Sequence, residues 1–268
     1  MKKKLVTGAL LCAFGAVAVT GGTLAYFTDE AETTNTFTTA KVNIALNEQQ
    51  RDIQDGQPIP GSALEVFEQG KKLFPIVTSA QSDGKDSWGL PLSKNYVDKI
   101  ITIANEADSS DAYVRVYIAV PEALDNATDA GKNVLHFNIG NKFDVNGGKD
   151  NPEAVVADHE NWGVETLLTP GFNIDGINYN IYYRDYNKVL PANTATGSAA
   201  YVGFYLDKNV DYDNVGGYYT INGEKIDYDF TKGVKVPVYA VGVQATGFTG
   251  ASEAVTAAFG ANFNPFAE

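Results

Sequence analysis

The sequence has very few residues that cross-link a protein or bind a transition metal. Its 268 residues include one cysteine and two histidines, so a disulfide framework and a metal cluster are both disfavoured. Basic residues are also scarce, because 20 Lys and Arg stand against 33 Asp and Glu, a formal net charge of −13. Such a surface repels phosphates, so we expect no nucleic-acid partner. The 26 glycines follow no period of three, which excludes collagen.

Apolar residues alternate with other residues along much of the chain. Val114, Val116, Ile118 and Val120 alternate in this way, and a period of two predicts a half-buried strand. Many short strands without alternating helices predict an all-β, jelly-roll-like β-sandwich. The expected strands cover residues 41–47, 71–77, 97–104, 113–120, 134–139, 178–184, 201–207, 217–221 and 234–245.

Helical signals are limited to two short segments. Pro121–Leu124 begins with Pro and an acid, as a first helical turn prefers. Ala251–Phe259 carries an apolar stripe and is followed by Gly260, which stops a helix. Residues 47–62 are interpreted as a long loop, and residues 41–268 as a single domain.

The first 25 residues have the pattern of a secretory signal peptide. Lys2–Lys4 form a positive start, and Leu5–Val19 is apolar but shorter than the ~20 residues of a membrane span. Small residues at Thr23 and Ala25 predict cleavage between Ala25 and Tyr26. We therefore expect a secreted protein of the extracellular matrix or cell surface.

Cleavage would change both the charge and the redox chemistry of the chain. It removes three lysines and Cys12, which leaves 17 basic and 33 acidic residues, a net charge of −16. The mature chain would contain no cysteine, so neither its stability nor any polymer could depend on disulfides.

Residues 26–40 form a predicted N-terminal arm. Its first half is acidic, with Asp29, Glu30 and Glu32, and six threonines favour an extended backbone. A β-prone arm on a sheet protein is suited to strand addition onto an open sheet edge of another molecule. The alternative is an arm that folds back as an edge strand of its own domain. The residues expected to act in this arm are Tyr26, Phe27, Phe37, Val42, Ile44 and Leu46.

Candidate catalytic and ligand sites are weak. His159 and Glu160 begin a zinc-peptidase motif, but the second histidine is missing, and His136 lies in a predicted strand. No Gly-x-Ser-x-Gly motif is present. We therefore expect no catalytic residue, no metal site and no cofactor. The acidic segments 144–150 and 211–214 are interpreted as solvated turns rather than calcium sites, and the strand tyrosines as cross-strand packing rather than a sugar-stacking face.

Several segments resemble a known family. The run from Gly21 to Asp29, followed by Asn35-Thr36-Phe37 and Val42-Asn43-Ile44, is similar to the TasA/camelysin family of Gram-positive biofilm-matrix proteins. Shorter similarities occur in residues 99–105, 111–116 and 241–248. The resemblance implies a jelly-roll subunit whose leader is removed by a SipW-type signal peptidase. It also implies assembly into extracellular fibres by N-terminal donor-strand exchange.

The sequence therefore favours a structural protein, a secreted subunit of biofilm-matrix or pilus-like fibres. Its expected partners are further copies of itself, a signal peptidase of the SipW type and, as candidates, minor fibre subunits. Two alternatives stay open. One is a secreted metallopeptidase of the camelysin type using His136, His159 and Glu160, and the other is a monomeric carbohydrate-binding module.

Overall fold

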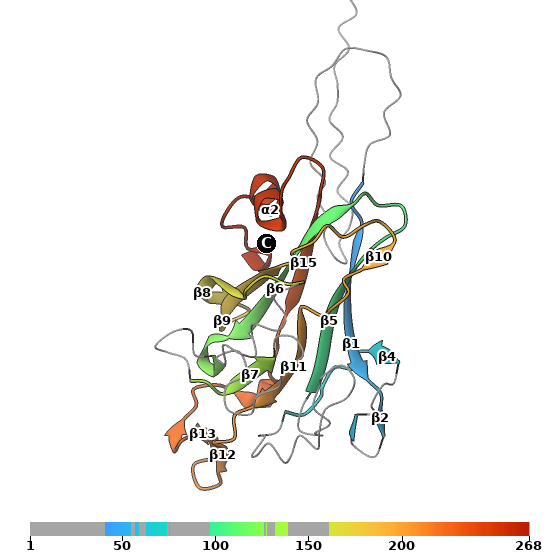
Figure 1. The fold of residues 1–268 in the computed structure, drawn as a ribbon. Helices are drawn as coiled ribbons and strands as arrows, with labels where there is room; N and C mark the ends of the chain where they lie inside the picture. The colour runs from blue at the N-terminus through green and yellow to red at the C-terminus, as the bar shows by residue number, and fades with distance from the viewer. Residues whose placement is uncertain are drawn as a thin grey trace, which may run out of the picture.

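The computed structural model describes residues 41–54, 57–58, 63–73, 75, 97–125, 127, 132–138 and 161–267. Most regular structure in these residues is antiparallel β-sheet, arranged as a two-sheet sandwich (Figure 1). The predicted all-β sandwich with short helices is confirmed. The predicted arm, residues 26–40, lies outside the described residues.

The first sheet of the sandwich has the strand order β4-β1-β5-β11-β7, and β10 also pairs with β5. Its longest partnership joins β1 and β5, with Ile44 opposite Asn105 and Gln49 opposite Ile100. A register shift between Tyr201 and Gly203 interrupts the pairing of β11 with β5. The strands are β1 (Ile44–Arg51), β4 (Leu64–Val66), β5 (Val97–Asn105), β7 (Leu135–Asn138), β10 (Thr194–Ala195) and β11 (Tyr201–Leu206).

The second sheet has the order β15-β6-β9-β8. Its strands are β6 (Ala112–Pro121), β8 (Thr166–Ile174), β9 (Ile177–Asp185) and β15 (Val238–Gln244). The sequence did not predict β8, because Pro170 and Gly171 interrupt its pattern. Pro is tolerated there because β8 is an edge strand, and the pairing with β9 is irregular on both sides of Thr169.

Smaller elements decorate the sandwich. A three-stranded sheet projects from one end of the molecule (Figure 1), and a short hairpin follows β1. The sheet comprises β12 (Val210–Asp213), β13 (Tyr218–Ile221) and β14 (Glu224–Lys225), and the hairpin β2 (Ile53–Gln54) and β3 (Gln57–Pro58). The 3-10 turns are η2 (Glu122–Leu124), η4 (Phe230–Lys232) and η5 (Pro265–Ala267), and the helix is α2 (Ala251–Phe259).

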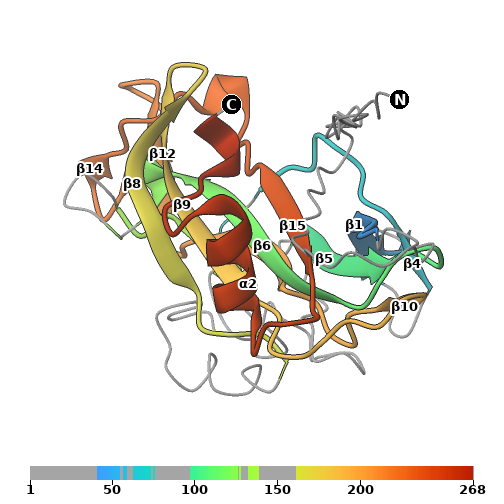
Figure 2. The same ribbon diagram turned by 90° about the horizontal axis from the view of Figure 1, so that it is seen from above.

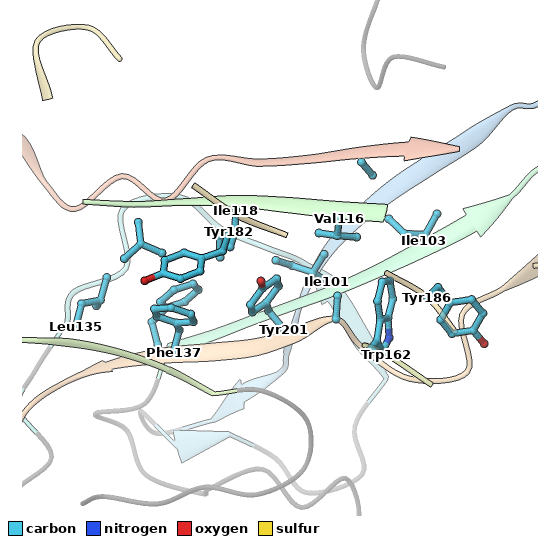
Figure 3. Packing of buried hydrophobic residues seen from close by; sticks show 14 of the residues in the cluster. Ile101, Ile103, Val116, Ile118, Leu135, Phe137, Trp162, Tyr182, Tyr186 and Tyr201 are labelled. Carbon is cyan, nitrogen blue, oxygen red and sulfur yellow. The ribbon is translucent and has the colours of Figure 1, made fainter. Parts of the chain in front are cut away.

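The main core lies between the two sheets and is rich in aromatic side chains (Figure 3). Phe137 packs against Tyr182, Tyr201 and Phe204, with ring centroids about 6 Å apart. Trp162 is fully buried, and its indole N–H donates to the carbonyl of Ser198 at 3.0 Å. Since the chain has a single cysteine and therefore no internal disulfide, burial of this kind supplies the stability.

A second apolar cluster covers the outer face of the β15-β6-β9-β8 sheet. Helix α2 packs on β6 and β15 (Figure 2), and Ala254 and Val255 are fully buried against Tyr117 and Val241. This helix overturns one expectation: β6 was predicted to be half-buried, but all ten of its residues are buried. Its non-core face packs against the helix and, at Ala119, against an apolar cluster with β8 and β9, instead of facing water.

Two further expectations are corrected. Residues 47–51 were interpreted as loop but continue β1 to Arg51, where polar side chains concealed the strand pattern. Residues 71–77 were predicted as a strand, but their described part forms only an isolated bridge from Pro75 to Leu206. The short helices were predicted correctly, with α2 occupying residues 251–259 and η2 following Pro121.

Candidate functional site

The two sheets of the sandwich are open along the same side. Strands β1 and β15 lie side by side there (Figures 1 and 2), yet no ladder joins them among the described residues. They run in opposite directions and approach closely at one end. A Cβ atom on Gly242 would come within 3.0 Å of side-chain carbons of both Val42 and Ile44. Glycine therefore permits this closest approach.

Both strands direct backbone groups into the space between them. Ala119 donates to the carbonyl of Pro237 at 2.9 Å, and Ala245 donates to that of Asp111. The alternation of an antiparallel ladder then points the backbone N–H and C=O groups of Val238, Ala240, Gly242 and Gln244 away from β6. These groups form an unpaired sheet edge within the described structure.

The same reasoning applies to β1. Glu106 donates to the carbonyl of Asn43 at 2.9 Å, so the backbone groups of Ile44, Leu46 and Glu48 point away from β5. The carbonyl of Glu48 accepts a hydrogen bond from Phe67 at 3.0 Å. The first part of β1 therefore presents a second open edge, opposite the edge of β15.

A groove runs between these edges, and we call it the edge groove. At its narrow end a hollow of about 490 Å³ lies beside Ile44, Leu46, Val238 and Ala240. At its wide end a larger hollow of about 740 Å³ lies between the ends of β1, β5 and β11 and the segment that leads into β15. The apolar floor of the wide end is formed by Leu135, Phe204, Leu206, Tyr219, Phe230 and Val236. An apolar, partly open hollow next to unpaired backbone is suited to an extended peptide.

Basic side chains surround the wide end. Its charged lining residues are four lysines and one glutamate. Lys99 donates to Glu48 at 2.6 Å, and its ammonium lies 4.9 Å from the centre of the Phe67 ring. Lys72 and Lys235 are exposed, and neither ammonium takes part in a salt bridge within the described residues. The lysines of the wide end are Lys71, Lys72, Lys99 and Lys235.

A buried ion pair joins β1 and β5 beside the wide end. The guanidinium of Arg51, at the end of β1, donates to both carboxylate oxygens of Asp98 on β5, at 2.7 and 2.6 Å. The backbone N–H of Arg51 also donates to Asp98, at 2.9 Å. Because both side chains are almost fully buried, this pair holds the two strands in register at the end of β1 next to the wide end.

The point at which the predicted arm joins the domain is also fixed. The carbonyl of Lys41 accepts a hydrogen bond from Ser110 at 2.7 Å, and the Lys41 ammonium pairs with Asp108 at 3.0 Å. The N–H of Asn43 donates to the hydroxyl of Ser109 at 3.0 Å. Lys41 therefore lies beside the turn between β5 and β6, at the end of β1 opposite the wide end of the groove.

The structure separates the residues that the sequence assigned to the arm. Val42 and Ile44 are buried in the domain's own core, and Leu46 packs against it. These three residues therefore anchor their own sandwich rather than a neighbour's, because β1 pairs with β5 of the same chain. Ala25 and Tyr26 at the predicted cleavage site, and Phe27 and Phe37 in the arm, lie outside the described residues.

His136 is fully buried on β7. Its Nε2 lies 2.9 Å from a carboxylate oxygen of Asp207, and its ring stacks on Tyr205 with centroids 4.9 Å apart. Burial alone would raise the pKa of Asp207. Its hydrogen bonds with His136 and the backbone N–H of Asn209 outweigh this effect, so the pKa lies below the ordinary 3.8. His159 and Glu160 lie outside the described residues, among which no cluster of three or more His, Cys, Asp or Glu side chains occurs.

The candidate calcium and sugar residues occupy ordinary structural positions. Asp213 accepts hydrogen bonds from the backbone N–H groups of Gly216 and Val215, which lower its pKa and hold the β12–β13 turn. Asp144–Asp150 lies outside the described residues. Of the strand tyrosines, Tyr179, Tyr182, Tyr201 and Tyr205 are buried in the sandwich.

The edge groove was not predicted from the sequence. Its two strands were expected, but their contact joins residues about 200 positions apart. The only local signals were the Lys71-Lys72 pair and Lys235, which carry no information about their proximity.

Comparison with known proteins finds a similarity at the start of the chain. Residues 1–63 match the family model described as camelysin metallo-endopeptidase. This match confirms the resemblance to the TasA/camelysin family over the N-terminal part. No curated protein sequence gives a significant match. Within the described residues, no helix is long and apolar enough to cross a membrane.

Proposed function

We propose that this chain, with its camelysin-type N-terminal part, is a secreted structural subunit of extracellular fibres. After removal of residues 1–25, the arm formed by residues 26–40 of one subunit enters the edge groove of the next and adds a strand to its sheet. The observation that carries this proposal is the pair of unpaired strand edges beside an apolar groove. A protein that exposes such an edge is prone to strand addition.

The positions of the arm and the groove favour head-to-tail assembly. The arm leaves the domain next to Lys41, whereas the wide end of the groove lies near Glu48 and Lys99, at the opposite end of β1. Fifteen extended residues reach up to ~50 Å, while β1 with its eight residues spans only ~26 Å. The arm can therefore reach a neighbour stacked on its own end. A contact between different surfaces does not close on itself, so it propagates a filament.

The direction of entry selects β15 as the pairing partner. An arm that enters the wide end of its neighbour runs antiparallel to β15 and parallel to β1. Antiparallel ladders are slightly more stable per residue, and Val238 and Ala240 supply the backbone groups. We assign strand exchange to the residues before Lys41, because Val42 and Ile44 are already buried in the core of the subunit to which they belong.

Electron microscopy tests this proposal. We expect the processed protein to form filaments without an accessory factor. A variant that begins at Lys41 should remain folded, with an unchanged far-ultraviolet circular dichroism spectrum, and should form none. Filaments of normal appearance from this truncated variant would refute the proposal.

A peptidase is the second candidate, because the matching family description names a metallo-endopeptidase. Its candidate residues are His136, His159 and Glu160, but the buried position of His136 and its bond to Asp207 support a structural role for that residue. Zinc content and casein hydrolysis of the purified protein would test this activity, with His159→Ala as the control. Stoichiometric zinc and hydrolysis that this substitution abolishes would favour the peptidase.

A further inference from the structure

We infer that the lysines at the wide end of the edge groove bind Glu30 and Glu32, in the acidic segment Asp29–Glu32 of a second copy of the chain, and thereby set the register of the arm. The inference rests on the proposed fibre role, and it names the chemistry that selects the arm. Strand pairing through the backbone is independent of sequence, so a second, side-chain signal is needed to place the arm at one position.

The charge at the wide end is opposite to that of the whole molecule. The chain carries 33 acidic and 20 basic residues, yet the lining of the wide end has four lysines and one glutamate. Lys99 is engaged by Glu48, and Lys71 by Glu68 at 2.8 Å. Lys72 and Lys235 are exposed and have no acidic partner among the described residues. Two ammonium groups at the mouth of the groove are therefore available to carboxylates from another molecule.

The charges of the arm are concentrated in the matching segment. Its acidic residues are Asp29, Glu30 and Glu32, and residues 33–40 carry no charge. In an extended segment Phe27, Asp29 and Ala31 share one face, while Glu30 and Glu32 share the other. With Phe27 directed toward the apolar floor, the two glutamates point outward, toward the exposed lysines at the mouth.

The lengths agree with this register. With Asp29–Glu32 at the lysines of the accepting subunit, residues 33–40 can span up to ~26 Å back to the domain from which the arm comes. Tyr26–Thr28 reach ~10 Å further along the groove. This places Phe27 over the floor near Phe204 and Leu206 and leaves the part of the groove beyond Ala240, toward Gly242, unoccupied. Because each mature subunit carries a net charge of about −16 from its composition, the lysines would also attract the arm against a general repulsion between copies.

A charge exchange on the full mature chain tests the inference. The acceptor variant is Lys72→Glu with Lys235→Glu, the donor variant is Glu30→Lys with Glu32→Lys, and a third variant combines all four changes. The control variant, Lys188→Glu with Lys225→Glu, has the same net charge as the acceptor variant but alters exposed lysines outside the groove lining. Filament elongation is followed by light scattering from each variant's own seeds at about 10 mM salt, where the Debye length is about 30 Å.

We expect the acceptor and donor variants each to elongate at least about tenfold more slowly than the wild type, the range in which electrostatic steering acts. The combined variant should return to within about threefold of the wild-type rate, and the control variant should elongate normally. Suppose that the wild type forms filaments but the acceptor variant elongates at an unchanged rate, or that the combined variant stays slow. Either result would overturn the lysine assignment and leave the fibre role intact. Failure of the wild type to form any filament would overturn both.

Discussion

Replacement of Ala240 by proline tests whether the outer edge of β15 receives the arm. The backbone N–H of Ala240 points away from β6 into the edge groove. Proline at this position therefore removes a donor from the open edge but no hydrogen bond from the ladder with β6. Edge strands tolerate proline in this orientation, so we expect Ala240→Pro to fold.

The magnitude follows from the loss of one backbone hydrogen bond between subunits. A bond of this kind contributes about 0.5–1.5 kcal/mol, so its loss raises the critical concentration for assembly about 2- to 13-fold. The proline ring also occupies space in the groove next to Val238 and Leu46. Its steric effect adds to this figure, which makes about twofold the smallest expected change.

The assay is the concentration of subunit that remains in solution after filaments have been sedimented. Gln244→Pro is the matched control, because Gln244 lies on the same open edge but beyond Gly242, the point of close contact with β1, which the arm does not reach in the proposed register. We expect the control to assemble like the wild type. An unchanged critical concentration for Ala240→Pro, or an equal defect in both variants, would refute the assignment of β15 as the acceptor edge.

Three further predictions concern the domain itself. Asp98→Ala removes the carboxylate that pairs with the buried guanidinium of Arg51. It should lower the free energy of unfolding by about 3–5 kcal/mol in urea titrations. A change below about 1 kcal/mol would contradict a stabilising role of this ion pair. Gly242→Val places side-chain atoms against β1 and should cost about 1–3 kcal/mol through overpacking, whereas unchanged stability would show that β1 moves freely. Asp207, whose pKa is lowered in the folded state, contributes stability above pH 3.8 that is lost as the pH falls through its folded pKa. The stability difference between the wild type and Asp207→Asn should therefore narrow below pH 3.8, and a constant difference would contradict the pairing with His136.

Much of the fold could be predicted from local patterns. Strands β5, β6, β9 and β11 were located to within a few residues, because their apolar residues repeat with a period of two. Helix α2 was located through its apolar stripe and Gly260. The burial of β6 could not be predicted, since it depends on α2 folding back over the sheet from more than 100 residues away.

Of the candidate site, only the arm could be predicted from the sequence. The acidic, threonine-rich composition of residues 26–40 predicts an extended segment suited to strand addition. Its acceptor depends on the meeting of β1 with β15, and on lysines from three distant segments that surround one hollow. These contacts are set by packing between the sheets, and the residues that form them have no common sequence signal.

Disulfide trapping between two differently labelled chains tests the central claim most directly, because the mature chain would contain no cysteine of its own. One chain carries Phe27→Cys in the arm, and the other carries Val238→Cys on β15, because both side chains lie on the core side of the sheet in the proposed pairing. Strand exchange predicts that mixing the two under oxidising conditions gives a cross-linked dimer containing one chain of each kind. A disulfide that forms only within a single chain carrying both substitutions, with no cross-link between mixed chains, would place the arm on its own sheet and contradict the account.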